Sequence, residues 1–103
     1  MSNKEITLIF PKNEFLIDPK VFPPLGILYL SSFLKSKDIG VHCIDMNLDD
    51  DLSGVDSEYI GISMTTPQRD EAYKILEHFK GRKTIAGGPH ATHMGKECIE
   101  KGF

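Results

Sequence analysis

The sequence predicts an α/β fold, a flavodoxin-like (Rossmann-like) three-layer sandwich in which helices cover both faces of a parallel sheet. Short strand-like runs alternate along the chain with segments of helical periodicity, which is the pattern of βαβ units. The strand-like runs are short and rich in β-branched and aliphatic residues, as in strands buried on both faces. Because crossovers between parallel strands are right-handed, we expect the strand order 2-1-3-4. With 103 residues, the chain is expected to form a single domain, residues 1–103.

Four runs of β-branched and aliphatic residues are the predicted strands. They cover residues 6–10, 41–46, 59–64 and 83–86. The first run ends at Pro11, and a long loop follows it. The acidic link at residues 48–57 is too short for a full crossover helix, so we expect a single turn there.

Three segments with helical periodicity are the predicted helices. They cover residues 24–37, 67–80 and 92–101. Pro24 suits the first turn of the first helix, whose wide apolar face predicts heavy burial. We expect Thr66 to cap the second helix with Pro67 at its first position, and Gly81 to end it. Thr92 is the expected cap of the last helix.

The composition is that of an ordinary globular protein, with 40% hydrophobic and 26% charged residues and a net charge of −3. No basic stripe is present to neutralise phosphates, which argues against a nucleic-acid partner. No apolar run approaches the roughly 20 residues of a membrane span, and the N-terminus lacks the apolar region of a signal peptide. Cys43 and Cys98 have no CxxC partner and are expected to be reduced thiols, so we expect a cytoplasmic protein.

Ligands of open α/β sheets bind beyond the carboxyl ends of the strands, where the strand order reverses. The loops 11–24, 63–67 and 87–92 are expected to meet there. The first of these loops has neither the GxGxxG motif of dinucleotide sites nor the Thr/Ser/Gly-rich phosphate loop of flavodoxins. The third strand is followed by Ser-Met-Thr at 63–65, where a response regulator carries an aspartate. These three uses of the fold are therefore not expected.

The fourth strand ends in the glycine pair Gly87-Gly88, followed by Pro89 and His90. Two adjacent glycines remove the side chains at a strand end, so a flat ligand can lie against the backbone. Together with Pro-Pro-Leu-Gly at 23–26 and Ser-Met-Thr at 63–65, this segment resembles the N-terminal cobalamin (B12)-binding domain of B12-dependent radical SAM enzymes. The resemblance implies a cofactor site formed by Pro11, Pro24, Leu25, Gly26, Ser63, Thr65, Thr66, Gly87, Gly88, Pro89 and His90.

The chain departs from other cobalamin domains after the first strand, where Phe-Pro-Pro-Leu at 22–25 supplies no histidine to ligate cobalt. Radical SAM enzymes of this family commonly lack that histidine too. The resemblance therefore implies cobalamin without a protein ligand to cobalt, and no metal-ligating residue in this chain.

Two isolated cysteines cannot form the CxxxCxxC motif that holds the iron–sulfur cluster of the family. The cluster and S-adenosylmethionine would belong to a downstream radical SAM domain, and this chain would only position cobalamin for it. Catalysis by the chain alone is not expected. The alternative function is a non-catalytic scaffolding or interaction domain with a vestigial ligand site.

Each of these residues also has a purely structural interpretation. Gly87 and Gly88 can relieve crowding where a strand meets a helix, and Ser63 and Thr65 can satisfy backbone groups at a strand end. Pro24 and Gly26 can serve as a rigid helix entry. His90 can be bonded to nearby protein groups.

The chain stops at Gly102-Phe103, where the related domains continue into a fifth strand. The resemblance therefore implies a domain that is incomplete at its C-terminus. Strand four would then be a sheet edge, with Lys83 as its one charged residue to discourage pairing with another chain. We accordingly expect a homodimer joined through strand four or through the exposed face of the last helix.

Overall fold

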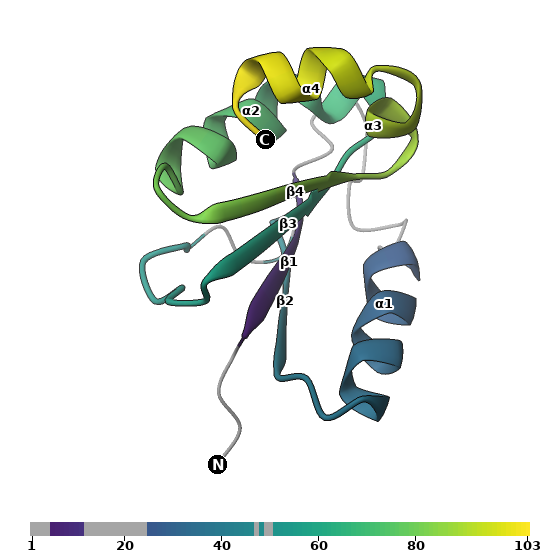
Figure 1. Ribbon diagram of the computed structural model, residues 1–103, viewed down its shortest axis with the longest axis vertical. Coiled ribbons are helices and arrows are strands. Elements are labelled where there is room, and N and C mark those ends of the chain that lie inside the picture. The colour runs from purple at the N-terminus through teal and green to yellow at the C-terminus, as the bar shows by residue number, and fades with distance from the viewer. Residues whose placement is uncertain (1–4, 12–24, 47, 49–50) are drawn as a thin grey trace.

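The computed structural model describes residues 5–11, 25–46, 48 and 51–103, and its centre is a four-stranded parallel sheet (Figure 1). The strands are β1 (Ile6–Phe10), β2 (Val41–Asp45), β3 (Tyr59–Ser63) and β4 (Lys83–Gly87). They lie in the order β2-β1-β3-β4, and every pair is parallel. This confirms the expected flavodoxin-like order.

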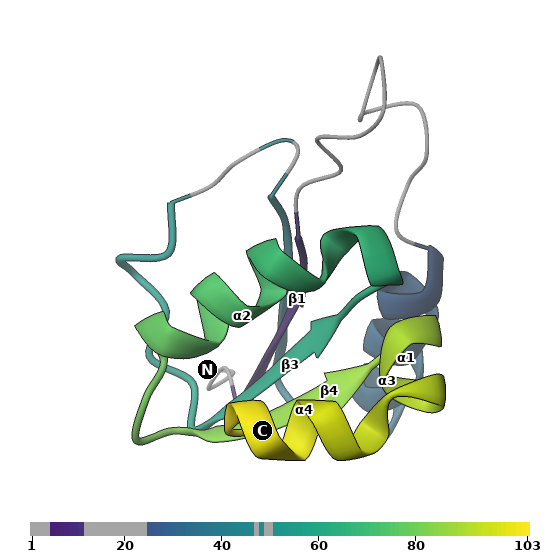
Figure 2. The ribbon, with the colours of Figure 1, turned by 90° about the horizontal axis from the view of Figure 1, so that it is seen from above.

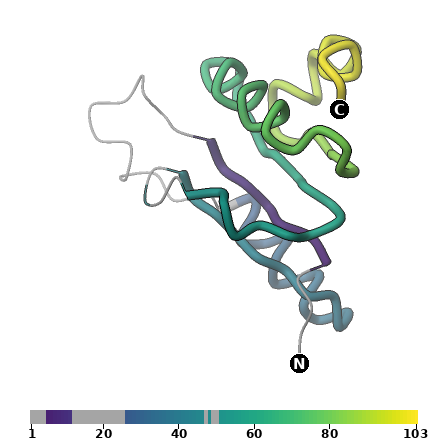
Figure 3. Tube along the Cα trace, turned by 90° about the vertical axis from the view of Figure 1, so that its left-hand side faces the viewer, coloured from purple at the N-terminus to yellow at the C-terminus, as the bar shows by residue number. Residues whose placement is uncertain are grey.

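Helices lie on both sides of the sheet and complete the three layers (Figures 1 and 3). One side carries α1 (Leu25–Ser36), which packs against β1 and β2. The other side carries α2 (Arg69–His78) and α4 (Gly95–Lys101), which Figure 2 shows crossing the sheet. None of the helices in the described ranges has the length and apolar character needed to cross a membrane.

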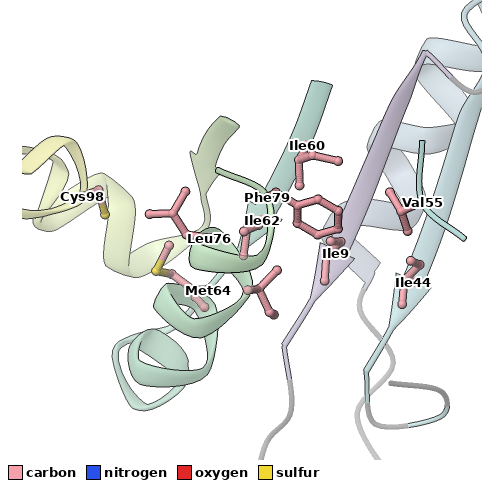
Figure 4. Close-up of a cluster of buried hydrophobic side chains, with 11 residues drawn as sticks. Ile9, Ile44, Val55, Ile60, Ile62, Met64, Leu76, Phe79 and Cys98 are labelled. Atoms are coloured by element: carbon pink, nitrogen blue, oxygen red, sulfur yellow. The ribbon is translucent and has the colours of Figure 1, made fainter. Parts of the chain in front are cut away.

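The larger hydrophobic core lies between the sheet and the α2–α4 layer (Figure 4). Ile9, Ile60 and Ile62 extend from the two central strands and are almost fully buried. Leu76 and Phe79 of the second helical segment pack onto them, and Cys98 of α4 joins the same cluster. This burial fits the prediction of central strands that are apolar on both faces.

The link between β2 and β3 takes the place of a crossover helix on this side of the sheet. Its described residues form turns but no helix, and Val55 inserts its side chain into the core beside Ile44 (Figure 4). The Arg82 guanidinium donates to the carbonyls of Ser57 and Val55, at 2.8 and 3.2 Å. A short acidic segment can therefore cover the sheet because one residue fills the core and one arginine holds its backbone.

The expectation that α1 is heavily buried is wrong. Ile27 faces the sheet, but Tyr29 is 77% exposed and Phe33 is 59% exposed. The reason is that α1 covers only the β1–β2 half of its side of the sheet. No described helix covers the β3–β4 half of that side.

Two helix starts also differ from the prediction. Thr65, not Thr66, is the extended cap residue before the short 3₁₀ helix η1 (Thr66–Gln68) that leads into α2. The segment predicted as one helix over 92–101 is two helices, α3 (Pro89–His93) and α4, which meet at Met94. Thr92 therefore lies inside α3, where its hydroxyl donates to the Gly88 carbonyl.

A buried hydrogen bond between Thr7 and Ser57 offers a test of how the β2–β3 link is held. The two hydroxyl oxygens lie 2.7 Å apart, and both residues are buried. Thr7→Val should lower the free energy of unfolding by about 1–3 kcal/mol, because it leaves a buried hydroxyl without its partner. The double variant Thr7→Val/Ser57→Ala should cost no more than Thr7→Val alone. Urea denaturation measures both, and strictly additive losses would show that the two hydroxyls do not act as a pair.

Candidate functional site

The carboxyl ends of β1, β3 and β4 meet at one edge of the sheet, as the parallel order requires. The backbone of Met64, just after β3, holds the end of β4 in place. Its N–H donates to the Gly87 carbonyl at 2.9 Å, and its carbonyl accepts from the His90 N–H at 3.1 Å. This pair of bonds turns the chain from β4 into α3.

The two glycines of the pair have different surroundings. Gly88 has φ +88°, and a side chain there would place its Cβ 2.6 Å from the Met64 carbonyl oxygen. Gly88 is therefore required by the close approach of two backbone segments. A Cβ on Gly87 would meet nothing closer than the Ile62 carbonyl oxygen, at 4.0 Å. Gly87 is the member of the pair that faces open space.

A cavity of about 190 Å³ runs from this edge along the uncovered half of the sheet, beside α1. Ser63 and Gly87 line it at the carboxyl edge, and Gly61 lines it farther down the sheet. Leu30 of α1 and Ile85 of β4 lie on its two sides. A Cβ on Gly61 would meet the Leu8 side chain at 2.9 Å. Because Gly61 has no side chain, the cavity reaches down to the backbone of the sheet at this position. The result is an apolar slot with the Ser63 side chain at its carboxyl-edge end, which we call the α1 slot.

A buried glutamine ties the loops of the edge together on the opposite side. The Gln68 side-chain amide donates to the Pro11 carbonyl at 2.8 Å, and its oxygen accepts from the Thr65 N–H at 2.9 Å and from the Thr65 hydroxyl at 3.0 Å. Pro11 and Thr65, both predicted ligand residues, are thus bonded to each other through Gln68. The sequence analysis missed Gln68, although it stands four residues before Ala72 on the apolar stripe of the helix.

His90 is 2% exposed, and both of its ring nitrogens have partners. Nδ1 lies 3.0 Å from the Thr66 hydroxyl, and Nε2 lies 2.9 Å from Glu97 Oε2 and 3.3 Å from the Tyr73 hydroxyl. Glu97 and Tyr73 were not predicted as site residues. The sequence did not indicate these contacts with His90. They depend on the helix break at Met94, which brings α4 back toward α2.

Burial raises the pKa of Tyr73 to about 12, and the neighbouring Cys98 and Glu97 add to the shift. An anionic phenolate would lose hydration and be repelled by these groups. Tyr73 therefore stays protonated and neutral beside His90.

The remaining predicted residues lie farther from this cluster or outside the described residues. Pro24 falls in the undescribed range, and Leu25 opens α1 with its side chain undescribed. Gly26 lies on the exposed face of α1, with nothing within 4 Å of an added Cβ. Pro89 is exposed at the start of α3. The structure thus brings together the residues after β1, β3 and β4, while Gly26 stands apart on the helix.

Within the described ranges, no group of three or more His, Cys, Asp or Glu side chains comes together as a metal site would require. His42, His78 and His93 are exposed. Both cysteines are free thiols.

No family model, curated protein or solved structure matches this chain. The functional argument therefore rests on the fold and on the geometry of the carboxyl edge.

The two glycines make a matched pair for testing the edge. Gly88→Ala should lower the free energy of unfolding by about 2–5 kcal/mol, because it combines an unfavourable positive φ with a clash against the Met64 backbone. Gly87→Ala should change it by about 0.5 kcal/mol or less. Thermal and urea unfolding measure both variants. Equal losses at the two positions would contradict the assignment of open space to Gly87 alone.

Tyr73 gives a pH prediction. Because the pKa of Tyr73 is raised from 10.0 to about 12, the folded state holds the phenol proton more tightly than the unfolded state. Its contribution to stability is complete below pH 10 and is lost as the pH rises toward 12. The absorbance of tyrosinate should show a late step near pH 12 that Tyr73→Phe removes and Tyr29→Phe, at an exposed position, leaves in place. Persistence of that step in Tyr73→Phe would refute the assignment.

Proposed function

We propose that this domain binds cobalamin in a form without a protein ligand to cobalt and positions it for a downstream radical SAM catalytic domain. The observation that carries the proposal is the α1 slot, which opens at the carboxyl edge between the polar residue Ser63 and the bare backbone of Gly87. Ligands of open α/β sheets bind at this edge.

The residues present fit a large, mostly flat cofactor with an apolar appendage. The space that a Cβ on Gly87 would fill is open, so a flat ring system can approach the backbone there. The apolar walls of the slot suit the buried part of such a cofactor, and the Ser63 hydroxyl at its mouth can hydrogen-bond to it. Thr66 and Pro89, both exposed residues, border the same edge.

The binding mode without a protein cobalt ligand is supported by the engagement of His90. Both of its ring nitrogens are within hydrogen-bond distance of protein groups. It is also buried on the α2 side of the edge, whereas the slot lies on the α1 side. Cobalamin would supply cobalt-centred group-transfer chemistry to the catalytic domain that it faces. This chain would contribute binding and orientation, with the iron–sulfur cluster and S-adenosylmethionine held elsewhere. The free thiols suit a cytoplasmic location.

A second candidate is a non-catalytic scaffolding domain, and the exposed side of α1 favours it. Tyr29 and Phe33, one helical turn apart on α1, are both exposed apolar side chains. A surface of this kind typically marks a contact with another protein.

Titration with hydroxocobalamin separates the two candidates. The visible spectrum of the cofactor should change in a saturable way on addition of the folded domain. Gly87→Val should weaken binding at least about tenfold, because its side chain would fill the space used by the ring system, while thermal unfolding of the variant controls for stability. Absence of binding at about millimolar concentrations in a folded sample favours the scaffold.

We further propose a homodimer joined through β4 or through α4. Among the described strands, β4 pairs only with β3, and its lysine, Lys83, is already paired with Glu58 at 3.0 Å. Ile85 on β4 and Ile99 on α4 are both exposed apolar side chains. Strand edges and apolar patches of this type favour self-association.

Light scattering at high protein concentration tests the dimer. Ile85→Lys should give a monomer if β4 forms the interface, and Ile99→Lys should do so if α4 forms it. Each variant serves as the control for the other, because both add one lysine at an exposed position. A wild-type protein that is monomeric at millimolar concentration would rule the dimer out.

A further inference from the structure

A chain of hydrogen bonds runs from α4 through the buried ring of His90 to the surface of the carboxyl edge. It begins at Glu97 Oε2, which lies 2.9 Å from His90 Nε2. It ends at Thr66 Oγ1, which lies 3.0 Å from His90 Nδ1. Glu97 is partly exposed and His90 is fully enclosed, while Thr66 is exposed at the start of η1. The three residues come from three different elements, so the fold alone brings them together.

The donors and acceptors along this chain are fixed by chemistry. An ionised carboxylate has only acceptor sites, so the short contact with Glu97 requires the proton of the ring to sit on Nε2. The Tyr73 hydroxyl, 3.3 Å from the same nitrogen, is neutral and can accept a share of that N–H. A bare Nε2 facing the carboxylate at 2.9 Å would set two lone pairs against each other.

In a neutral imidazole with its proton on Nε2, the other nitrogen is a pure acceptor. The Thr66 hydroxyl must then donate its only proton to Nδ1. Its oxygen keeps two lone pairs, which are left for groups outside the protein.

We propose that Glu97 and His90 lock the Thr66 hydroxyl as a hydrogen-bond acceptor toward the ligand, so that this position selects an N–H donor. For cobalamin, whose ring carries carboxamide side chains, the selected group is a carboxamide N–H. Thr66 is the residue that contacts the ligand, and His90 and Glu97 are positioning residues. This inference rests on the proposed cobalamin function for the identity of the ligand but not for the lock itself.

The lock is tested without any ligand by the tautomer of His90. Two-bond ¹H–¹⁵N correlations of the histidine rings at pH 8 distinguish the Nε2–H form, the Nδ1–H form and the imidazolium, and His90→Gln identifies the signals. We expect the Nε2–H form in the wild type, and Glu97→Gln should weaken this preference, because a side-chain amide can donate as well as accept. An Nδ1–H ring or an imidazolium at pH 8 overturns the lock.

The selection is tested with hydroxocobalamin and with its derivatives in which one carboxamide is converted to a carboxylate. Thr66→Val should weaken binding of hydroxocobalamin about 3- to 10-fold, the value of one hydrogen bond, while Thr66→Ser should stay within about twofold. Thr92→Val is the matched control, because that exposed threonine is bonded to Gly88 and lies outside the chain of bonds.

The derivative whose converted group is the one that contacts Thr66 should bind the wild type more weakly than hydroxocobalamin does. In that derivative, the acceptor oxygens of the carboxylate face the acceptor oxygen of Thr66. Thr66→Val should remove that difference. If the wild type and Thr66→Val show the same loss of affinity for each derivative relative to hydroxocobalamin, the proposed selection is wrong. If hydroxocobalamin does not bind the wild type at all, the proposed function and the ligand in this inference both fail, while the tautomer measurement still decides the lock.

Discussion

The carboxyl edge of the sheet depends on one close backbone approach, that of Gly88 to Met64. The Met64 N–H binds the Gly87 carbonyl and the Met64 carbonyl accepts from the His90 N–H, on either side of Gly88, and only a residue without a side chain fits at position 88. This contact ends β4 and starts α3 in a single step. It thereby sets Gly87 at the mouth of the α1 slot and turns His90 into the interior on the other side. The geometry proposed for ligand binding follows from it.

The two sides of the edge have different chemistry for the same reason. On the α2 side, the buried polar atoms of Gln68 and His90 each have a partner in the protein, which fixes the loops after β1, β3 and β4. Satisfied networks of this kind make a local structure rigid and specific. On the α1 side, the helix covers only half of the sheet and leaves an apolar slot. The carboxyl edge therefore combines a rigid polar frame with an open apolar slot beside it.

The sequence was sufficient to predict the fold because buried central strands such as β1 and β3 are rich in aliphatic residues and alternate along the chain with segments of helical periodicity. It placed the glycine pair at the right edge but could not tell the two glycines apart, because their roles depend on the backbone of Met64. It placed the last helix start at Thr92, a good cap residue, whereas the His90 N–H bond to Met64 starts the helix at Pro89. The apolar face of α1 showed which residues favour burial, but not how much of the sheet the helix would cover. Gln68 and Glu97 were missed because their partners lie far away in the chain or across a helix break.

The most direct test of the central claim is a map of the amide signals that move when hydroxocobalamin is added to the ¹⁵N-labelled domain. If the cofactor lies at the mouth of the α1 slot, the largest ¹H–¹⁵N shifts should fall on Ser63 and Gly87 and on the α1 residues that line the slot, Ile27, Leu30 and Leu34. Residues at the opposite end of the sheet, such as Tyr59 and Lys83, should not move. Shifts confined to the exposed side of α1, around Tyr29 and Phe33, or no shifts at all, would contradict the account.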